Sequence, residues 1–312
     1  MPSSDHPSDS HLRDSHLRDS HLKDLADTLE ASGEYRVLRK LQSVSQYAPD
    51  DGSEKKRALY VDVETTGRNP QQDEVIELAM VPFTYSQDGR IFSLEEPFQA
   101  LREPTKPIPA EITAITGIDD AMVAGCRIDP AEVEHFMAEA DLIIAHNASF
   151  DRRFLERFCP AFMHKPWACS MSQIDWQGEG FEGQKLVWLA AGAGFFYEKH
   201  RAIHDCRAGI ELLARPLPKS GEPGLRQLLA RARTPEWRIF ATGAPYDLKD
   251  VLQARGYRWN GDASGAQRAW FIDIEDAKRD AECHFLQTEI YRRDVDVHCL
   301  RIDAFDRFSD RI

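Results

Sequence analysis

Val61-Asp62-Val63-Glu64-Thr65-Thr66-Gly67 is the stretch on which the predicted fold and function most depend. Side chains alternate faces along an extended strand, so the two valines point to one face and the two acids to the other. Neighbouring buried carboxylates cannot both stay ionised without a counter-charge, which a hard divalent cation can supply. The last three residues form a tight turn whose backbone amides can approach a phosphate. The alternative is an edge strand with two solvated acids.

The composition is that of a soluble globular protein. The 312 residues suffice for one large domain and a smaller unit, with 42% hydrophobic and 29% charged residues. No apolar run approaches the ~20 residues of a membrane span, and residues 1–24 do not resemble a secretory signal. The six cysteines form no CxxC pair, which argues for reduced thiols and against a zinc ribbon. We expect a cytoplasmic protein with no membrane association.

The net charge of −13 would ordinarily argue against a nucleic-acid partner. An enzyme can, however, hold its cationic charge as bound metal and as a local basic patch. Residues 211–258 contain nine Lys or Arg against five Asp or Glu, so a basic segment lies within an acidic chain. Nucleic acid therefore stays open as a partner.

The N-terminal region predicts little buried structure. Three copies of a five-residue repeat begin at Asp9, Asp14 and Asp19, and a period of five matches neither a helix face nor a strand face. We therefore expect a disordered tail over residues 1–24, with metal capture by its histidines as the alternative. Residues 25–56 predict two short helices, broken at Gly33 and packed on the main domain, followed by a linker.

Residues 57–215 show the pattern of an α/β domain. After the opening strand, strands are expected over residues 74–84 and 90–98, joined by a turn at Asp88-Gly89. Leu142–Ala145 is a short, fully apolar strand, which is typical of a buried parallel position. Further predicted elements are helices over 110–117, 130–140, 186–193 and 200–213 and a strand over 167–174. Together they indicate a mixed sheet flanked by helices.

Two further acidic segments lie where predicted helices begin. In His146-Asn-Ala-Ser-Phe-Asp151, the acid falls in the first turn of a helix that follows a strand, where ligand crevices form in α/β sheets. His200-Arg-Ala-Ile-His-Asp205 opens the last helix of the domain. Phosphodiester hydrolysis with two divalent cations needs several carboxylates from different segments. A histidine with a pKa near neutrality can accept the proton of the attacking water.

In this order, the three segments resemble the motifs of the DEDDh, or DnaQ-like, 3'-5' exonuclease family, which includes the polymerase III epsilon and RNase T type domains. Pro109–Ile118 is similar to the family's segment between the first two motifs, and the resemblance covers Ala58–Leu213. It implies a ribonuclease H-like fold and 3'-end hydrolysis to nucleoside 5'-monophosphates. It further implies that His200 is the general base and that two Mg²⁺ or Mn²⁺ ions are held by Asp62, Glu64, Asp151 and Asp205.

Substrate contacts are also implied by the resemblance. Thr65 and Thr66 would contact the terminal nucleotide, and Ile118 is available as an apolar neighbour of the 3' end. Phe150 is a candidate for base stacking, although such a residue more often belongs to the core. The sequence departs from the family at Arg68, where an apolar residue commonly follows the turn.

Two more histidines lie within the motifs. The family spacing places the base five positions before Asp205, which selects His200 over His204. His146 precedes the helix of Asp151, where we expect a supporting or capping role rather than a catalytic one.

The C-terminal part predicts a basic helix or linker over residues 216–235 and a small α+β domain over residues 236–312. Its element order is β-α-β-β-α-β, the ferredoxin-like pattern. Cations and aromatics alternate in it, as suits binding of unpaired bases. Alternatively, Trp259 and Trp270 are cross-strand core partners and the arginines form a solvated rim.

The expected function is therefore a metal-dependent 3'-5' exonuclease acting on single-stranded or frayed ends, with DNA favoured as substrate. The motifs do not separate DNA from RNA, because the metal site contacts phosphate and not the 2'-OH, so an exoribonuclease stays open. A polymerase-associated proofreading or 3'-end-binding accessory module is the alternative from another class, with a DNA polymerase as its partner.

Overall fold

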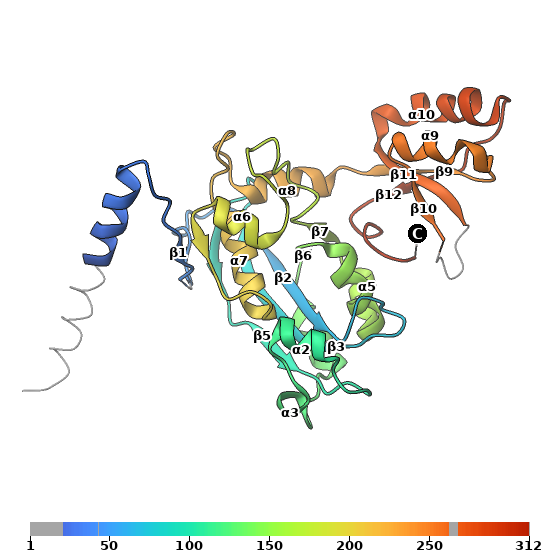
Figure 1. The fold of residues 1–312 in the computed structure, drawn as a ribbon. Coiled ribbons are helices and arrows are strands. Elements are labelled where there is room, and N and C mark those ends of the chain that lie inside the picture. The colour runs from blue at the N-terminus through green and yellow to red at the C-terminus, as the bar shows by residue number, and fades with distance from the viewer. Residues whose placement is uncertain (1–20, 43, 262–267, 312) are drawn as a thin grey trace, which may run out of the picture.

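The computed structural model describes residues 21–42, 44–261 and 268–311 of the chain. They form a six-stranded mixed sheet with its helices and a separate four-stranded sheet towards the C-terminus (Figure 1). In this described part of the chain, no helix is long and apolar enough to cross a membrane. Most of the predicted repeat tail lies outside the described residues, and its last four residues, 21–24, are helical rather than disordered.

The six-stranded sheet is built around β2, which carries the opening acidic stretch. β2 pairs antiparallel with β3 and parallel with β6, in the strand order β4-β3-β2-β6-β7, while β5 also pairs with β3. This arrangement confirms the predicted mixed sheet. The strands are β2 (Lys56–Thr65), β3 (Val75–Tyr85), β4 (Ile91–Leu94), β5 (Phe98–Leu101), β6 (Leu142–Ala145) and β7 (Trp167–Cys169).

Helices cover both faces of this sheet, as the alternation along β2 requires. Tyr60 lies in an apolar cluster with α6, α7 and α8, whereas Val61 lies in a second cluster with α4 and α5. Two shorter helices, α2 and α3, follow β5 (Figure 1). The helices are α2 (Ala110–Thr116), α3 (Asp120–Val123), α4 (Pro130–Met137), α5 (Ala148–Phe158), α6 (Leu186–Gly192), α7 (Ala202–Ala214) and α8 (Gly224–Arg233).

Helix α7 lies unusually close to β2. A Cβ added at Gly209 would come within 2.1 Å of the Tyr60 ring, so a larger residue would push the helix away from the strand. Because Asp205 stands one turn earlier on α7, this close approach brings it towards the acids of β2.

Several local predictions are wrong. The second N-terminal helix is absent from the described residues: Arg39–Lys40 instead forms a strand, β1, parallel to β8 (Phe195–Phe196). The first helix, over residues 21–31, keeps Leu25 and Leu29 exposed and so does not pack on the domain. The predicted strand over 90–98 is divided into β4 and β5, because the Glu95-Glu96-Pro97 segment interrupts it. The predicted strand over 167–174 ends at Cys169.

The C-terminal unit, residues 236–302, confirms the βαββαβ arrangement. Its strand order β10-β11-β9-β12, with every neighbouring pair antiparallel, corresponds to the order 2-3-1-4 of a ferredoxin-like sheet. Two main helices pack on one face, where Ile239, Leu252 and Leu286 form a small core. The elements are β9 (Glu236–Ala241), α9 (Lys249–Ala254), β10 (Arg258–Asn260), β11 (Ala269–Glu275), α10 (Arg279–Phe285) and β12 (Cys299–Ile302).

The two tryptophans of this unit are cross-strand partners, as one alternative predicted. Trp259 lies opposite Trp270, with ring centroids 5.7 Å apart. Trp259 is nevertheless 54% exposed, so it caps the edge of the core rather than filling it. The Gly- and Asn-rich turn between the two strands falls largely outside the described residues.

The segments on either side of the C-terminal unit belong structurally to the larger sheet. Helix α8 buries Leu225 and Leu228 in the same core as α7, so it is not a free linker. After β12, residues 303–311 turn back and pack on α5, where Phe308 joins the second apolar cluster. The C-terminal unit is therefore held at both ends.

Candidate active site

Three of the predicted acids form a carboxylate cluster at the end of β2. One oxygen from each of Asp62, Glu64 and Asp205 lies within 4.8 Å of the others. Asp151 stands beside them, and its Oδ1 accepts a hydrogen bond from the backbone N–H of Val63 at 3.2 Å. The structure thus brings the four acids together from a strand and from the first turns of α5 and α7.

The electrostatics of the cluster favour a bound cation. Burial raises the pKa of Asp62 well above its usual range, and the charges of Asp151 and Asp205 raise it further. Burial likewise raises the pKa of Glu64 and of Asp151 to about 8 in each case. The donors are all carboxylate oxygens, the ligands that hard divalent cations prefer. Carboxyls of this acidity exchange their protons for a cation near neutral pH.

The backbone before each acid-bearing helix is unusual. Asn147, which precedes α5, and His200, which lies two residues before α7, have φ of 70° and 64°, in the left-handed region that few non-glycine residues adopt. Strained residues of this kind are typical of functional sites. Asp151 and Asp205 also lie at helix N-termini, where the peptide dipoles favour negative charge.

His200 lies next to the cluster. Its backbone N–H donates a hydrogen bond of 2.8 Å to Oδ2 of Asp205, and its side chain is partly exposed. The other two motif histidines are engaged elsewhere. Nδ1 of His204 hydrogen-bonds with the Glu198 carbonyl at 3.0 Å, and the ring of His146 hydrogen-bonds with Ser170 and the Gln184 carbonyl at 3.0 and 2.8 Å. Burial lowers the pKa of His146 to about 4, which suits a neutral structural residue.

Comparison with known proteins agrees with this geometry. The RNase T exonuclease family model matches residues 59–213. The chain is 31% identical over 179 residues to the uncharacterized exonuclease CP81 of Escherichia phage 186, covering 50% of this chain and 85% of that protein. The chain belongs to the DnaQ-like exonuclease family. The resemblance noted in the three motifs is therefore confirmed.

Other relatives of this DnaQ-like chain are larger proteins. It is 27% identical over 218 residues to a PolC-type DNA polymerase III of Caldanaerobacter subterraneus subsp. tengcongensis, a match that covers 65% of this chain and 15% of that protein. Among solved structures, a crystal structure of exonuclease I in complex with the inhibitor BCBP has a TM-score of 0.50 at 15% identity, covering 81% of this chain and 64% of that one. At that identity the likeness concerns the fold alone.

Two residues of the DnaQ-like site lie outside the predicted set. The Tyr197 hydroxyl donates a hydrogen bond of 2.9 Å to Oδ1 of Asp205. Glu77, fully buried on β3 opposite Glu64, accepts hydrogen bonds of 3.0 Å from Arg201 and from the backbone N–H of Ala202. The Glu77–Arg201 pair thereby fixes the start of α7 next to His200. A single acid within the apolar run of residues 75–83 was the signal that could have identified it.

The two predicted threonine contacts, Thr65 and Thr66, are hydrogen-bonded within the turn that follows β2. Thr65 donates a hydrogen bond of 2.5 Å to the Gly67 carbonyl, and the Thr66 hydroxyl accepts one of 2.9 Å from the N–H of Glu74. A Cβ at Gly67 would lie 2.4 Å from the Asp73 carboxylate, so the turn requires glycine. The family departure, Arg68, is exposed.

The two apolar candidates are enclosed by neighbouring side chains. Ile118 is fully buried beside Ile76 and Ile108, and its contact with the 3' end stays a prediction. Phe150 packs on Phe154 with ring centroids 4.9 Å apart, which favours its place in the core.

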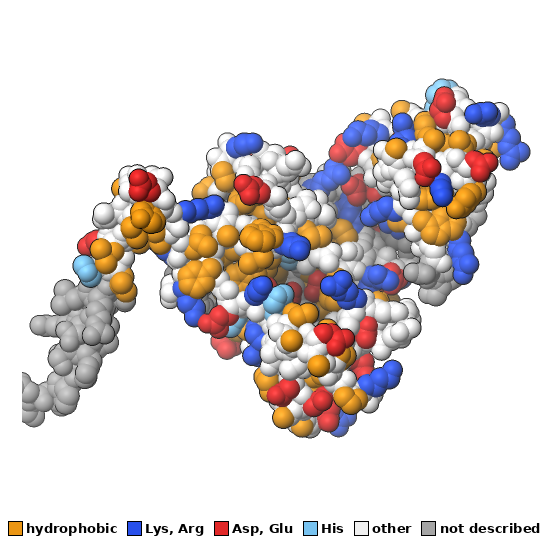
Figure 2. Space-filling model, viewed as in Figure 1, with side chains coloured by type: hydrophobic (Ala, Val, Ile, Leu, Met, Phe, Trp, Pro, Cys, Tyr) orange, Lys and Arg blue, Asp and Glu red, His pale blue; other side chains and the backbone are white. Residues whose placement is uncertain are grey.

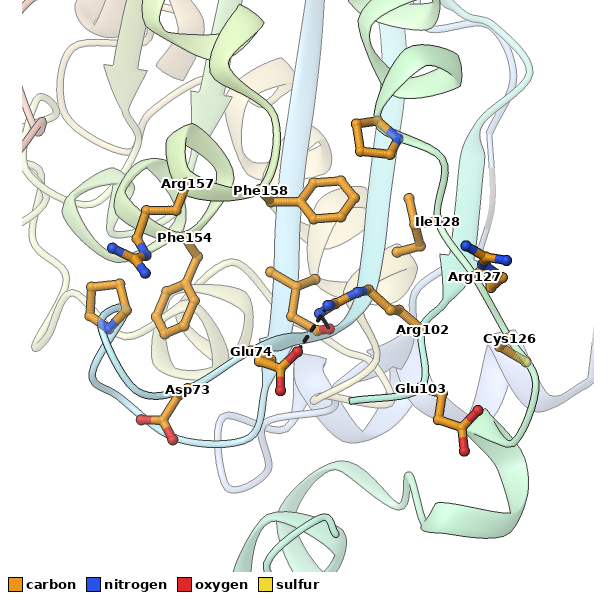
Figure 3. A pocket seen from close by; sticks show the side chains of 13 residues that line it. Asp73, Glu74, Arg102, Glu103, Cys126, Arg127, Ile128, Phe154, Arg157 and Phe158 are labelled. Atoms are coloured by element: carbon orange, nitrogen blue, oxygen red, sulfur yellow. Dashed lines mark hydrogen bonds and ion pairs between the residues drawn. The ribbon is translucent and has the colours of Figure 1, made fainter. Parts of the chain in front are cut away.

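A pocket of about 580 Å³ lies next to the turn that follows β2. Its lining includes Asp73, Arg102 and Arg157 together with the rings of Phe154 and Phe158, which come from the turn, from the segment after β5 and from α5 (Figure 3). None of the four acids is among the described residues that line it. This pocket is therefore distinct from the carboxylate cluster.

Proposed function

We propose that this chain is a metal-dependent 3'-5' exonuclease that hydrolyses phosphodiester bonds at DNA 3' ends and releases nucleoside 5'-monophosphates. The observation that carries the proposal is the cluster of partly buried, mutually repelling carboxyls beside His200, in a chain of the DnaQ-like exonuclease family. Polarity and product follow from the resemblance of the three motifs to DEDDh enzymes.

Each member of the cluster has a proposed role. Asp62, Glu64, Asp151 and Asp205 would hold two Mg²⁺ or Mn²⁺ ions, which would offset their repulsion and stabilise charge on the attacking and leaving oxygens. Asp205 is oriented for this by the Tyr197 hydroxyl and the His200 N–H. The partly exposed imidazole of His200 would accept the proton of the attacking water.

We also propose a domain assignment. The nuclease domain would comprise residues 57–215 together with α8 and the returning segment 303–311, because both pack on its core. The C-terminal unit, residues 236–302, would form the second domain.

The proposal is tested by time-resolved digestion of matched 5'-labelled single- and double-stranded DNA and RNA with Mg²⁺, Mn²⁺ or EDTA. We expect a ladder that shortens from the 3' end of single-stranded DNA, supported by either cation and abolished by EDTA. Shortening from the 5' end or full activity in EDTA would overturn the proposal. Faster digestion of RNA than of DNA would favour the exoribonuclease alternative.

A polymerase-associated role is the second candidate, since the matched segment of the PolC-type relative lies within a DNA polymerase III. The purified chain alone distinguishes the two: hydrolysis without any partner supports an independent enzyme. Activity that appears only after addition of a DNA polymerase supports the accessory module.

A further inference from the structure

The four-stranded sheet has two different faces. Ile239, Ala241 and Ile272 point to the face covered by α9 and α10. Their strand neighbours Phe240 and Phe271, which lie directly opposite each other on β9 and β11, point to the other face. Among the described elements, the helices of this unit lie on the side of the sheet away from α5, as Figure 1 shows. The second face is therefore turned towards the nuclease domain.

This second face carries a platform of aromatic and cationic side chains, formed by Arg238, Phe240, Arg258, Phe271 and His298. The guanidinium groups of Arg238 and Arg258 lie 4.4 and 4.8 Å from the ring centroid of Phe271. Phe240 is 6% exposed and supports the ring of the exposed His298, whose centroid is 5.0 Å away. Aromatic residues on the central strands of a four-stranded sheet are one of the established ways to stack unpaired bases.

Three platform residues, Arg238, Arg258 and Phe271, line one wall of a cleft of about 370 Å³ between the C-terminal unit and the nuclease domain. Ser149 and Arg153 of α5 line the opposite wall. The lining has five arginines against three carboxylates, in a chain whose net charge is −13. Figure 2 shows Lys and Arg side chains gathered where the C-terminal unit meets the rest of the molecule. The cleft is thus a cationic site in an acidic protein, and it is complementary to phosphate.

Helix α5 lies between the cleft and Asp151 of the carboxylate cluster. Ser149 and Arg153 lie two positions before and after Asp151, so they occupy the side of the helix turned away from that acid. A strand leaving the cluster crosses about one helix diameter, ~10 Å, to reach the cleft. At the ~3.4 Å rise of a stacked nucleotide, this distance corresponds to about three nucleotides.

We propose that the platform binds the single-stranded DNA that lies on the 5' side of the scissile end. Bases stack on His298 and on the guanidinium of Arg258, which Phe271 supports from below, while phosphates accept hydrogen bonds from Arg258. Arg258 pairs with Asp273 at 2.8 Å, and the several donors of its exposed guanidinium allow a phosphate to be bound alongside that carboxylate. The inference rests on the proposed exonuclease function, because it assigns the path of the same strand.

The first test measures binding of the full chain in EDTA to fluorescent dT15 and rU15 over a range of salt concentrations. We expect Arg258→Ala and Phe271→Leu each to weaken dT15 binding about 5- to 20-fold, the range for one phosphate or stacking contact. Arg258→Ala should also lower the salt slope by about 0.7, the value for one phosphate of a single strand. Phe271→Leu, which removes no charge, should leave that slope unchanged.

The second test measures hydrolysis with Mg²⁺ on dT15 and dT3. The ratio of kcat/KM on dT15 to that on dT3 should fall about 5- to 20-fold in both variants, because the shorter strand ends before the platform. Arg293→Ala is the matched control, since it removes an exposed arginine of the same unit outside the lining of the cleft. It should behave as the wild type in both tests.

The outcomes separate this inference from the proposed function. Wild-type affinity for dT15 in both variants overturns the platform, and a loss confined to rU15 overturns DNA as its occupant. No hydrolysis of either oligonucleotide by the wild type overturns the exonuclease proposal, while the binding test in EDTA still decides the platform. If Phe271→Leu unfolds, Arg258→Ala and His298→Ala, at exposed positions, supply the same comparison.

Discussion

Two consecutive residues of α5, Asp151 and Arg152, are both buried charges, with 2% and 0% of their surface exposed. Arg152 donates four hydrogen bonds: its Nε donates to Glu156 at 2.7 Å, and its terminal nitrogens donate to backbone carbonyls of residues 304, 305 and 307. Asp151 accepts one backbone hydrogen bond and otherwise faces like charge. One residue therefore anchors the returning C-terminal segment, whereas the other is placed for a cation.

The largest expected effect follows from removing the negative charge of Asp151. Asp151→Asn should lower exonuclease activity by roughly 10²- to 10³-fold, the range for removing one preorganised electrostatic group. The unfolding temperature in EDTA at pH 8 should be unchanged or higher, because a repelling carboxylate is lost. Digestion assays and thermal unfolding check the two effects. Full activity of this variant would remove Asp151 from the site.

The second prediction concerns Arg152, the residue that anchors the returning C-terminal segment. Arg152→Met should lower the free energy of unfolding by about 3–5 kcal/mol, because buried Glu156 loses its ion pair at 2.7 Å and three backbone carbonyls of the C-terminal segment lose their donors. Urea unfolding measures the loss. Arg153→Met is the control: its ion pair with Asp310 is partly exposed, so we expect a change of about 0–1 kcal/mol. Equal losses in the two variants would contradict the anchoring role.

A third, smaller effect concerns the Glu77–Arg201 ion pair. Its charges are hydrogen-bonded to each other, as Arg152 is to Glu156, but this pair lies beside the carboxylate cluster. Glu77→Gln should reduce activity by about 10- to 100-fold, the range for residues that orient ligands. The charge of Glu77 also raises the pKa of Glu64, so the acid limb of the pH–rate profile should move to lower pH.

The control for this prediction is Glu74→Gln, which disrupts the ion pair with Arg102 on the same sheet, away from the cluster. Its activity and pH–rate profile should match the wild type. A loss of activity in Glu77→Gln without any change in the profile would indicate a purely structural role for the pair.

The last prediction concerns the pH dependence of stability. The folded-state pKa of Glu64 and Asp151 is about 8, above the ordinary 4.5 and 3.8. The folded state therefore binds more protons than the unfolded state in this window, so stability in EDTA should fall as pH rises from about 4 to about 8.

Added Mg²⁺ or Mn²⁺ should reverse this loss and raise the unfolding temperature more at pH 8.5 than at pH 5.5, because binding displaces the protons. Thermal scans with and without cation measure the difference. The Asp151→Asn variant should show a weaker pH dependence, and a cation effect independent of pH would contradict the assignment of the cluster.

The sequence alone determined the features that are local in the chain. The four acids and His200 lie in short segments whose strand end or helix start can be recognised from the neighbouring residues, and the resemblance of those segments to the DEDDh motifs supplied their predicted roles. The alternation along β2 can be predicted from that strand alone, and the βαββαβ order can be predicted from the succession of elements along the chain. Tyr197 lies only eight positions before Asp205, so its contact with that acid could have been predicted in the same way.

Only the tertiary structure decided the features that join distant segments. Glu77 meets Arg201 across 124 positions, and the returning C-terminal segment meets Arg152 across more than 150. The burial of Ile118, the β1–β8 pairing and the cleft facing α5 have the same origin. The physical reason is that periodicity reports which face of an element is buried, whereas the partner that buries it is chosen by long-range packing.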